Sequence, residues 1–202
     1  MDEVFAANRA ELCGMVAEAP RYSHESRGTE FYIFPLETCR LSGTADRLNI
    51  VLRRDMVTPL LEEGATVRVA GELRSFNNKS GVGNRLILTI FARNIEPWYG
   101  EDENRITLTG TICKEPGLRM TPMGREICDL ILAVGRRYHR SDYIPVITWG
   151  LQAREVARCE VGDRLSLQGR LQSRAYTKVV DGVAEERLAY EVSAADVFFA
   201  QA

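Results

Sequence analysis

The chain has 202 residues, 45% of them hydrophobic and 27% charged, and a net charge of −2 at pH 7. This composition is ordinary for a globular protein of one large domain or two small ones. Residues 1–100 carry 12 basic and 13 acidic side chains and residues 101–202 carry 14 and 15, so neither half is basic overall. The even balance counts against a uniformly basic nucleic-acid-binding domain, although local basic clusters suffice for phosphate contact.

Targeting, metal-binding and catalytic signals are absent from the sequence. The N-terminal residues MDEVFAANRAEL lack the apolar core of a signal peptide, and no apolar run reaches the length of a membrane span, so we expect a cytoplasmic protein with reduced thiols. The five cysteines form no CxxC pair and the only histidines, His24 and His139, are isolated, which predicts neither a zinc site nor a disulfide framework. Without paired carboxylates, a Ser/His/Asp set or a phosphate-binding glycine loop, we expect no cofactor and no enzymatic activity.

An internal repeat divides the chain into two copies of one domain. A shift of 96 residues places the run RLNIVLRR, residues 47–54, on YIPVITWG, residues 143–150. The same shift matches Asn8, Arg9, Leu12, Gly14 and Pro20 with Asn104, Arg105, Leu108, Gly110 and Pro116. We therefore predict a first domain at 1–97, a linker at 98–103 within EPWYGEDENR, and a second domain at 104–202.

Each copy is predicted to contain five strands and one short helix. In the first copy the strands fall near 9–17, 29–39, 46–53, 65–76 and 85–95, with the helix around Met56 to Glu63. In the second copy they fall near 106–112, 128–134, 143–149, 164–176 and 187–199, with a helix at 151–160 that ends before Gly162. This order is that of a five-stranded OB barrel, so we predict an all-β protein of tandem OB folds, although periodicity alone also allows another small barrel.

The third strand of the second copy carries two aromatic residues on one face. Tyr143 and Trp149 lie six positions apart, and an even separation places both rings on the same side of a strand. Ile144, Val146 and Thr148 have the opposite parity. Two aligned rings on a strand either complete the core or form a platform on which flat ligands such as bases stack.

The second copy resembles the bacterial single-stranded DNA-binding protein family. The resemblance covers residues 104–197 and is carried by NRITLTGTICKEPGLRMTPMG, DYIPVITWG, GDRLSLQGRLQSRAY and the turn at Gly182; residues 8–95 share the frame more weakly. It implies sequence-independent binding of single-stranded DNA in replication, recombination or repair. The family's four stacking positions correspond here to Tyr138, Tyr143, Trp149 and Tyr176, and three of these are tyrosine where the family usually has tryptophan. The basic residues that flank the first and last rings are Arg136, Arg137, Arg140, Arg170, Arg174 and Lys178.

The first copy lacks this aromatic set. The repeat carries the four ring positions back to Ser42, Arg47, Arg53 and Asn78. Arg47 and Arg53 are candidates for phosphate contact, against the alternative of an ordinary solvated face, and Phe76, Tyr22 or Tyr32 are candidate substitutes for the missing rings. We therefore hypothesise that the second copy binds bases while the first completes the assembly or guides the backbone.

The resemblance also sets expectations for partners. Two-barrel family members form dimers with four barrels, which predicts a homodimer. The loop RRYHRSD is short, and the chain ends in AADVFFAQA without the glycine-rich linker and acidic tip that recruit repair enzymes, so recruitment through such a tip is not expected. A primosomal-type OB-fold module that binds a helicase and single strands is the alternative. The choice between DNA and RNA stays open, because no residue is assignable to recognition of the 2′-hydroxyl.

Overall fold

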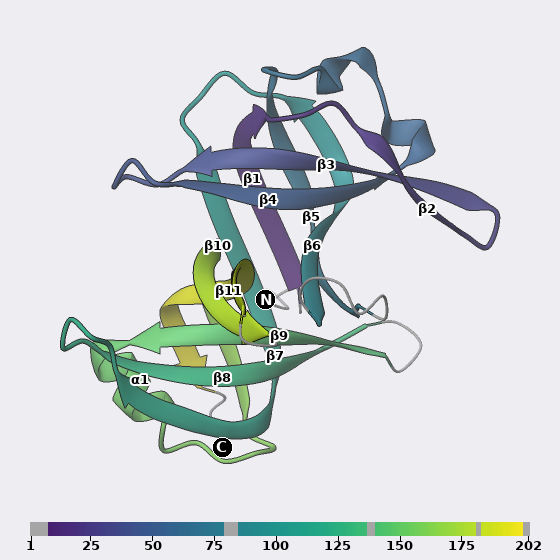
Figure 1. Ribbon diagram of the computed structural model, residues 1–202. Coiled ribbons are helices and arrows are strands. Elements are labelled where there is room, and N and C mark those ends of the chain that lie inside the picture. The colour runs from purple at the N-terminus through teal and green to yellow at the C-terminus, as the bar shows by residue number, and fades with distance from the viewer. Residues whose placement is uncertain (1–7, 79–84, 137–139, 181–182, 200–202) are drawn as a thin grey trace. The chain divides into compact units, whose positions relative to one another are not determined.

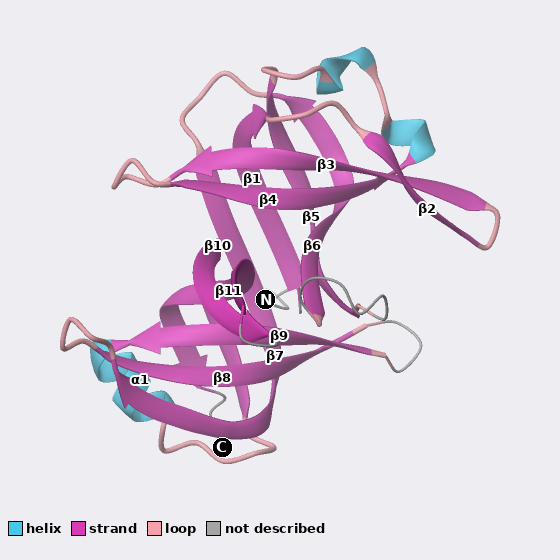
Figure 2. Ribbon diagram, in the orientation of Figure 1, coloured by secondary structure: helices cyan, strands magenta, loops and turns pink. Residues whose placement is uncertain are grey.

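The computed structural model describes residues 8–78, 85–136, 140–180 and 183–199. In these ranges the chain is mostly β-strand (Figure 2). Its contacts define two compact units. One comprises Arg9–Arg74 and Leu88–Arg105, and the other contains Ser75–Ile87 and Ile106–Ala202.

The N-terminal barrel is a closed ring of five strands (Figure 1). These strands are β1 (Asn8–Val16), β3 (Thr29–Cys39), β4 (Ala45–Arg53), β5 (Thr66–Asn77) and β6 (Leu86–Pro97). Strand β1 pairs antiparallel with β3 and β5, β3 pairs antiparallel with β4, and β4 pairs parallel with β6, which neighbours β5. This is the strand order of an OB fold.

The C-terminal barrel repeats the same pairings. It is built from β7 (Glu103–Met120), β8 (Glu126–Gly135), β9 (Ser141–Trp149), β10 (Arg164–Val180) and β11 (Val183–Phe199), with helix α1 (Gly150–Val156) after β9. Strand β7 pairs with β8 and β10, β8 pairs with β9, and β9 runs parallel to β11. The prediction of an all-β chain with tandem OB folds is therefore confirmed.

Alternate residues of the central strands fill each barrel. Leu48, Ile50 and Leu52 of β4 are buried, as are Ile144, Val146 and Thr148 of β9 at the positions 96 residues later. Burial of alternate side chains is what the period of two in the sequence predicts. The residues between them in β4 and β9, which have the opposite parity, therefore lie on the outer faces of these strands.

The structure differs from the sequence prediction in the first copy. Strand β2 (Arg21–Ser26), which pairs with β3, was not predicted, because all six of its residues are exposed and the segment has no apolar alternation. The helix predicted around Met56 to Glu63 is wrong: two 3₁₀ turns, Arg54–Met56 and Pro59–Leu61, occupy this segment. The residue before a proline disfavours the α conformation, and Thr58, which precedes Pro59, is extended.

The helix of the second copy is present but shorter than predicted. Helix α1 ends at Val156, and Gly162 lies beyond it with a φ of 106°. A positive φ of this size favours glycine. This glycine therefore serves the turn before β10 and does not cap the helix.

Candidate nucleic-acid interface

Two aromatic side chains share one face of β9, as their sequence parity predicts, and this face is the outer one. Tyr143 is 53% exposed and Trp149 is 36% exposed, whereas Ile144 and Val146 between them point into the barrel and are buried. The alternative that these rings complete the barrel core is therefore wrong. The face they occupy is accessible to a flat ligand.

The Trp149 indole is directed across the neighbouring strand. Its Nε1–H donates a hydrogen bond to Ser193 Oγ of β11 at 3.0 Å. Ser193 is also the residue of β11 that lies opposite Ile147 in the parallel pairing with β9. Ile147 has the same parity as Trp149 but is only 4% exposed. A ring that is already fixed by a hydrogen bond loses less side-chain entropy when a base stacks on it.

The start of β9, next to Tyr143, is fixed by Ser75. The Tyr143 backbone N–H donates to Ser75 Oγ at 2.8 Å, and the Ser75 N–H donates to Asp142 Oδ1 at 2.5 Å. Asp142 has no exposed side-chain surface and receives two hydrogen bonds from the Arg136 guanidinium. The Arg136 Nη2 also donates to the Ser75 carbonyl oxygen at 3.2 Å.

Arg136 is therefore bound to a buried carboxylate. Its side chain is only 20% exposed, and its guanidinium lies 5.6 Å from the centre of the Phe76 ring. A phosphate contact by Arg136, as predicted from sequence, would have to compete with Asp142. This contact stays a prediction, and the structure adds a different role, in which Arg136 positions the start of β9.

Sequence reasoning missed the Arg136–Asp142 pair, although the repeat contains a signal for it. Arg40 and Asp46 lie 96 residues earlier, and Arg40 donates to both carboxylate oxygens of Asp46 at 2.6 and 2.5 Å. Asp46, like Asp142, is fully buried. A charged pair that recurs in both copies at the same spacing indicates a structural ion pair in the frame of the fold.

The fourth predicted ring, Tyr176, lies on β10 and is partly exposed. The Arg174 guanidinium lies 5.9 Å from the centre of its ring, and Tyr176 pairs across β10 and β11 with Arg187, six residues along β11 from Ser193. Arg170 is exposed and donates to Gln172 Oε1 at 3.3 Å. Tyr176 thus lies with Arg174 on the β10–β11 hairpin rather than on the face of β9.

The remaining predicted residues of the second copy are less defined. Arg140 is exposed, and its carbonyl oxygen accepts a hydrogen bond from the Arg136 backbone N–H at 2.7 Å. Arg137 and Tyr138 lie outside the described residues. Lys178 belongs to β10, but its side chain is outside the described part of the structure.

In the first copy the four equivalent positions carry no aromatic side chain. Arg47 pairs with Glu18 and with Glu37, the latter at 3.2 Å. Arg53 pairs with Asp55 at 3.1 Å. A phosphate that contacts either arginine would therefore have to displace the carboxylate that the arginine already binds.

The proposed substitutes and the other two positions have separate locations. Tyr22 and Tyr32 form an edge-to-face pair with ring centres 6.0 Å apart, and Phe76 is exposed. Ser42 lies in the turn between β3 and β4, where its hydroxyl contacts the Thr44 hydroxyl at 3.4 Å. The Asn78 N–H donates to the Arg85 carbonyl oxygen at 2.7 Å.

Other kinds of site find no support in the described residues. In that part of the chain, no group of three or more His, Cys, Asp or Glu side chains is placed to hold a metal ion. No described helix is long and apolar enough to cross a membrane. All five cysteines are free thiols, and burial raises the pKa of the Cys13 and Cys128 thiols from 9.0 to about 11.

An OB barrel with exposed rings and arginines on one sheet has the features of proteins that bind single-stranded nucleic acid. Comparison with known proteins agrees, and the chain belongs to the single-strand binding protein family, whose model matches residues 103–200. It is 37% identical over 103 residues to the single-stranded DNA-binding protein of Clostridium tetani, a match that spans 48% of this chain and 69% of that protein. It is 38% identical over 80 residues to single-stranded DNA-binding protein A of Bacillus subtilis, spanning 36% of this chain and 46% of that protein.

A solved structure resembles the whole chain. The single-stranded DNA binding protein from Thermus aquaticus matches with a TM-score of 0.78, at 23% sequence identity, over 96% of this chain and 93% of that one. At this identity the likeness concerns the fold. It extends over both barrels, whereas the family model matches only the second.

Proposed function

We propose that this protein binds single-stranded DNA without sequence preference, and that bases stack on Tyr143 and Trp149 of the C-terminal barrel. The observation that carries the proposal is the alternation on β9, where the aliphatic residues fill the barrel and the two rings remain exposed on its outer face. Every base has a π-face, so stacking contributes roughly 1 to 3 kcal/mol per base whatever the sequence. The site therefore needs no base-edge recognition.

Arginine side chains near the rings supply the phosphate contacts in this proposal. Arg140, Arg170 and Arg174 are exposed, and Arg174 adjoins the ring of Tyr176. The proposed set also includes Tyr138, Arg136, Arg137 and Lys178 from the second copy and Arg47 and Arg53 from the first. Because phosphate contacts release counterions, binding should weaken steeply as salt is added.

The two copies are proposed to have different roles in binding. Residues 104–202 bind the bases, residues 98–103 join the copies, and residues 1–97 carry a degenerate stacking face.

A homodimer with four barrels is part of the proposal. So are a non-enzymatic role in DNA replication, recombination or repair and a cytoplasmic, nucleoid-associated location. Sedimentation tests the dimer, and a monomer at micromolar concentration would contradict it.

A binding titration tests the function. The affinity of the full chain for labelled oligo-dT, oligo-rU and duplex DNA is measured by fluorescence anisotropy at several salt concentrations, with the wild type, Tyr143→Ala and Trp149→Ala. Each substitution should lower oligo-dT affinity about tenfold, the equivalent of one stacked base. Tyr99→Ala is the matched control, because Tyr99 is 94% exposed and lies outside both barrels' strands.

The outcomes are distinct. Unchanged oligo-dT affinity in both variants, or duplex binding as tight as that of oligo-dT, would reject the stacking proposal. Comparison of oligo-dT with oligo-rU decides between DNA and RNA. Capture of a replicative helicase by the wild-type chain, together with weak oligo-dT binding, would favour the primosomal alternative.

A further inference from the structure

Three aromatic rings form a row on the N-terminal barrel. The His24 ring of β2 stacks on Phe31 of β3, with ring centres 5.0 Å apart and planes inclined by 17°. Phe31 in turn contacts Phe91 of β6, with ring centres 5.9 Å apart. We call His24, Phe31 and Phe91 the N-terminal aromatic row.

The strand register places this row beside β4, the strand of the first copy that corresponds to β9. Phe31 lies opposite Arg53 across β3 and β4, and Phe91 lies opposite Val51 across β4 and β6. Residues directly opposite in a pair of strands project from the same face. The row therefore shares the outer face of β4 with Arg53.

At the corresponding positions of the C-terminal barrel, the central strand carries the aromatic side chain and its two neighbours do not. There Trp149 occupies the place of Arg53, and Ile127 of β8 lies opposite Trp149. Ser193 of β11, which lies opposite Ile147, occupies the place of Phe91. In the first copy, aromatic side chains have thus moved from the central strand to its two neighbours, and arginine has taken the central position.

The row is accessible and has cationic side chains around it. His24 is exposed, and Phe31 and Phe91 are partly exposed, whereas Ile127 at the place of Phe31 is buried. The Arg93 guanidinium lies 4.8 Å from the centre of the Phe91 ring. Rings flanked by arginine on an open sheet face are the chemistry that suits unpaired bases and their phosphates.

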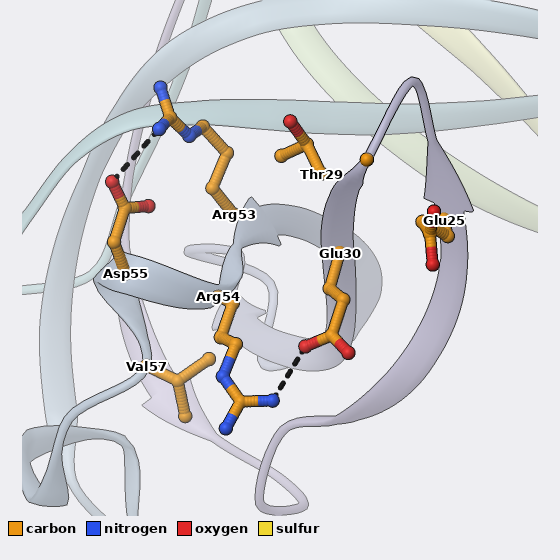
Figure 3. A pocket seen from close by; sticks show the side chains of 8 residues that line it. Glu25, Thr29, Glu30, Arg53, Arg54, Asp55 and Val57 are labelled. Atoms are coloured by element: carbon orange, nitrogen blue, oxygen red, sulfur yellow. Dashed lines mark hydrogen bonds and ion pairs between the residues drawn. The ribbon is translucent and has the colours of Figure 1, made fainter.

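Arg53, the strand partner of Phe31, lines a groove (Figure 3). Its volume is about 680 Å³, and it lies between the β2–β3 hairpin and the turn after β4. Arg53 and Arg54 line it, paired with Asp55 at 3.1 Å and with Glu30 at 2.6 Å respectively. Exposed ion pairs contribute little net stability, so a phosphate can compete for either arginine. Because Glu25, Glu30 and Asp55 also line the groove, such a contact is weak.

We propose that the N-terminal aromatic row is a second base-stacking surface for single-stranded DNA, with Arg53, Arg54 and Arg93 as its phosphate contacts. The proposal rests on the proposed function and replaces the expectation that the first copy only guides the backbone. Each of the three arginines already faces a carboxylate, as Arg136 and Arg174 do in the second copy, so a phosphate contact here must compete with that carboxylate.

Substitution by leucine tests the row without removing its apolar volume. Phe31→Leu/Phe91→Leu is compared with Phe198→Leu, a matched change at an exposed phenylalanine of β11. Both are made in the wild type and in the Tyr143→Ala/Trp149→Ala background. The probe is oligo-dT of about 30 nucleotides, which covers two OB folds at up to about 16 nucleotides each.

The row variant should lower the residual oligo-dT affinity of the Tyr143→Ala/Trp149→Ala protein about tenfold and reduce the number of nucleotides that the wild type occludes. Photocrosslinking with 5-iododeoxyuridine in the same oligonucleotide should label peptides that contain His24, Phe31 or Phe91. Melting temperatures of the variants confirm that each is folded.

The proposal fails if the row variant matches Phe198→Leu in both affinity and occluded length and if crosslinks fall only within residues 104–202. The row would then be a surface for protein contact or a packing feature. Failure of the proposed function is a different result, because the wild type itself would then not bind oligo-dT.

Discussion

Replacement of Asp142 by asparagine should destabilise the C-terminal barrel strongly. The change keeps the shape of the side chain but removes the negative charge that faces Arg136, whose side chain is only 20% exposed and would be left without its counter-ion. Loss of one member of a buried ion pair costs about 3 to 5 kcal/mol. Because Arg136 keeps some contact with water and asparagine retains an acceptor for the Ser75 N–H, we expect the lower value, about 3 kcal/mol.

The assay is urea unfolding followed by tryptophan fluorescence. The chain has two tryptophans, so a Trp98→Phe background makes Trp149 the reporter of the C-terminal barrel. The free energy of unfolding is taken from the midpoint at constant m-value. Asp129→Asn is the matched control, because Asp129 and its partner Arg119 are 45% and 50% exposed and such a pair contributes at most about 1 kcal/mol.

The reasoning would be refuted by a loss below about 1 kcal/mol, or by equal losses for Asp142→Asn and Asp129→Asn. The repeat offers an internal check. Asp46→Asn should destabilise the N-terminal barrel by a similar amount, because Arg40 binds Asp46 in the same way. Trp98 reports this change in a Trp149→Phe background.

Three further predictions concern the C-terminal barrel. Gly110→Ala should cost about 2 kcal/mol in urea unfolding, because a Cβ there would lie 2.6 Å from the Ala133 carbonyl oxygen; Gly117→Ala, with nothing within 4 Å, should be near neutral. Ser193→Ala removes the acceptor of the Trp149 indole N–H, and should lower oligo-dT affinity roughly two- to fivefold by anisotropy because the ring must then be ordered on binding. The pKa of the Cys128 thiol rises from 9.0 to about 11 on burial, so its contribution to stability is complete below pH 9 and is lost as pH rises toward 11. The urea midpoint of Cys128→Ala should accordingly fall less over that interval than the midpoint of the wild type, and an equal fall would contradict this.

Local pattern and the internal repeat were enough to predict the architecture. The period of two placed Ile144, Val146 and Thr148 on one face of a strand and Tyr143 and Trp149 on the other, and the structure shows that the first face lines the core. The repeat also fixed which residues occupy equivalent places in the two barrels. Strand β2 was beyond this reasoning, because RYSHES has no buried side chain, and it forms only through its backbone pairing with β3.

Tertiary structure decided which residues share a face when they come from different strands. The sequence determined that the first copy lacks rings at the four expected positions, but not that His24, Phe31 and Phe91 meet beside Arg53. Likewise, the sequence placed a basic residue at position 136, but it did not show that Arg136 binds the buried carboxylate of Asp142. Parity along one strand follows from the covalent chain alone, whereas contacts between strands depend on register and on the parallel pairing that closes each barrel.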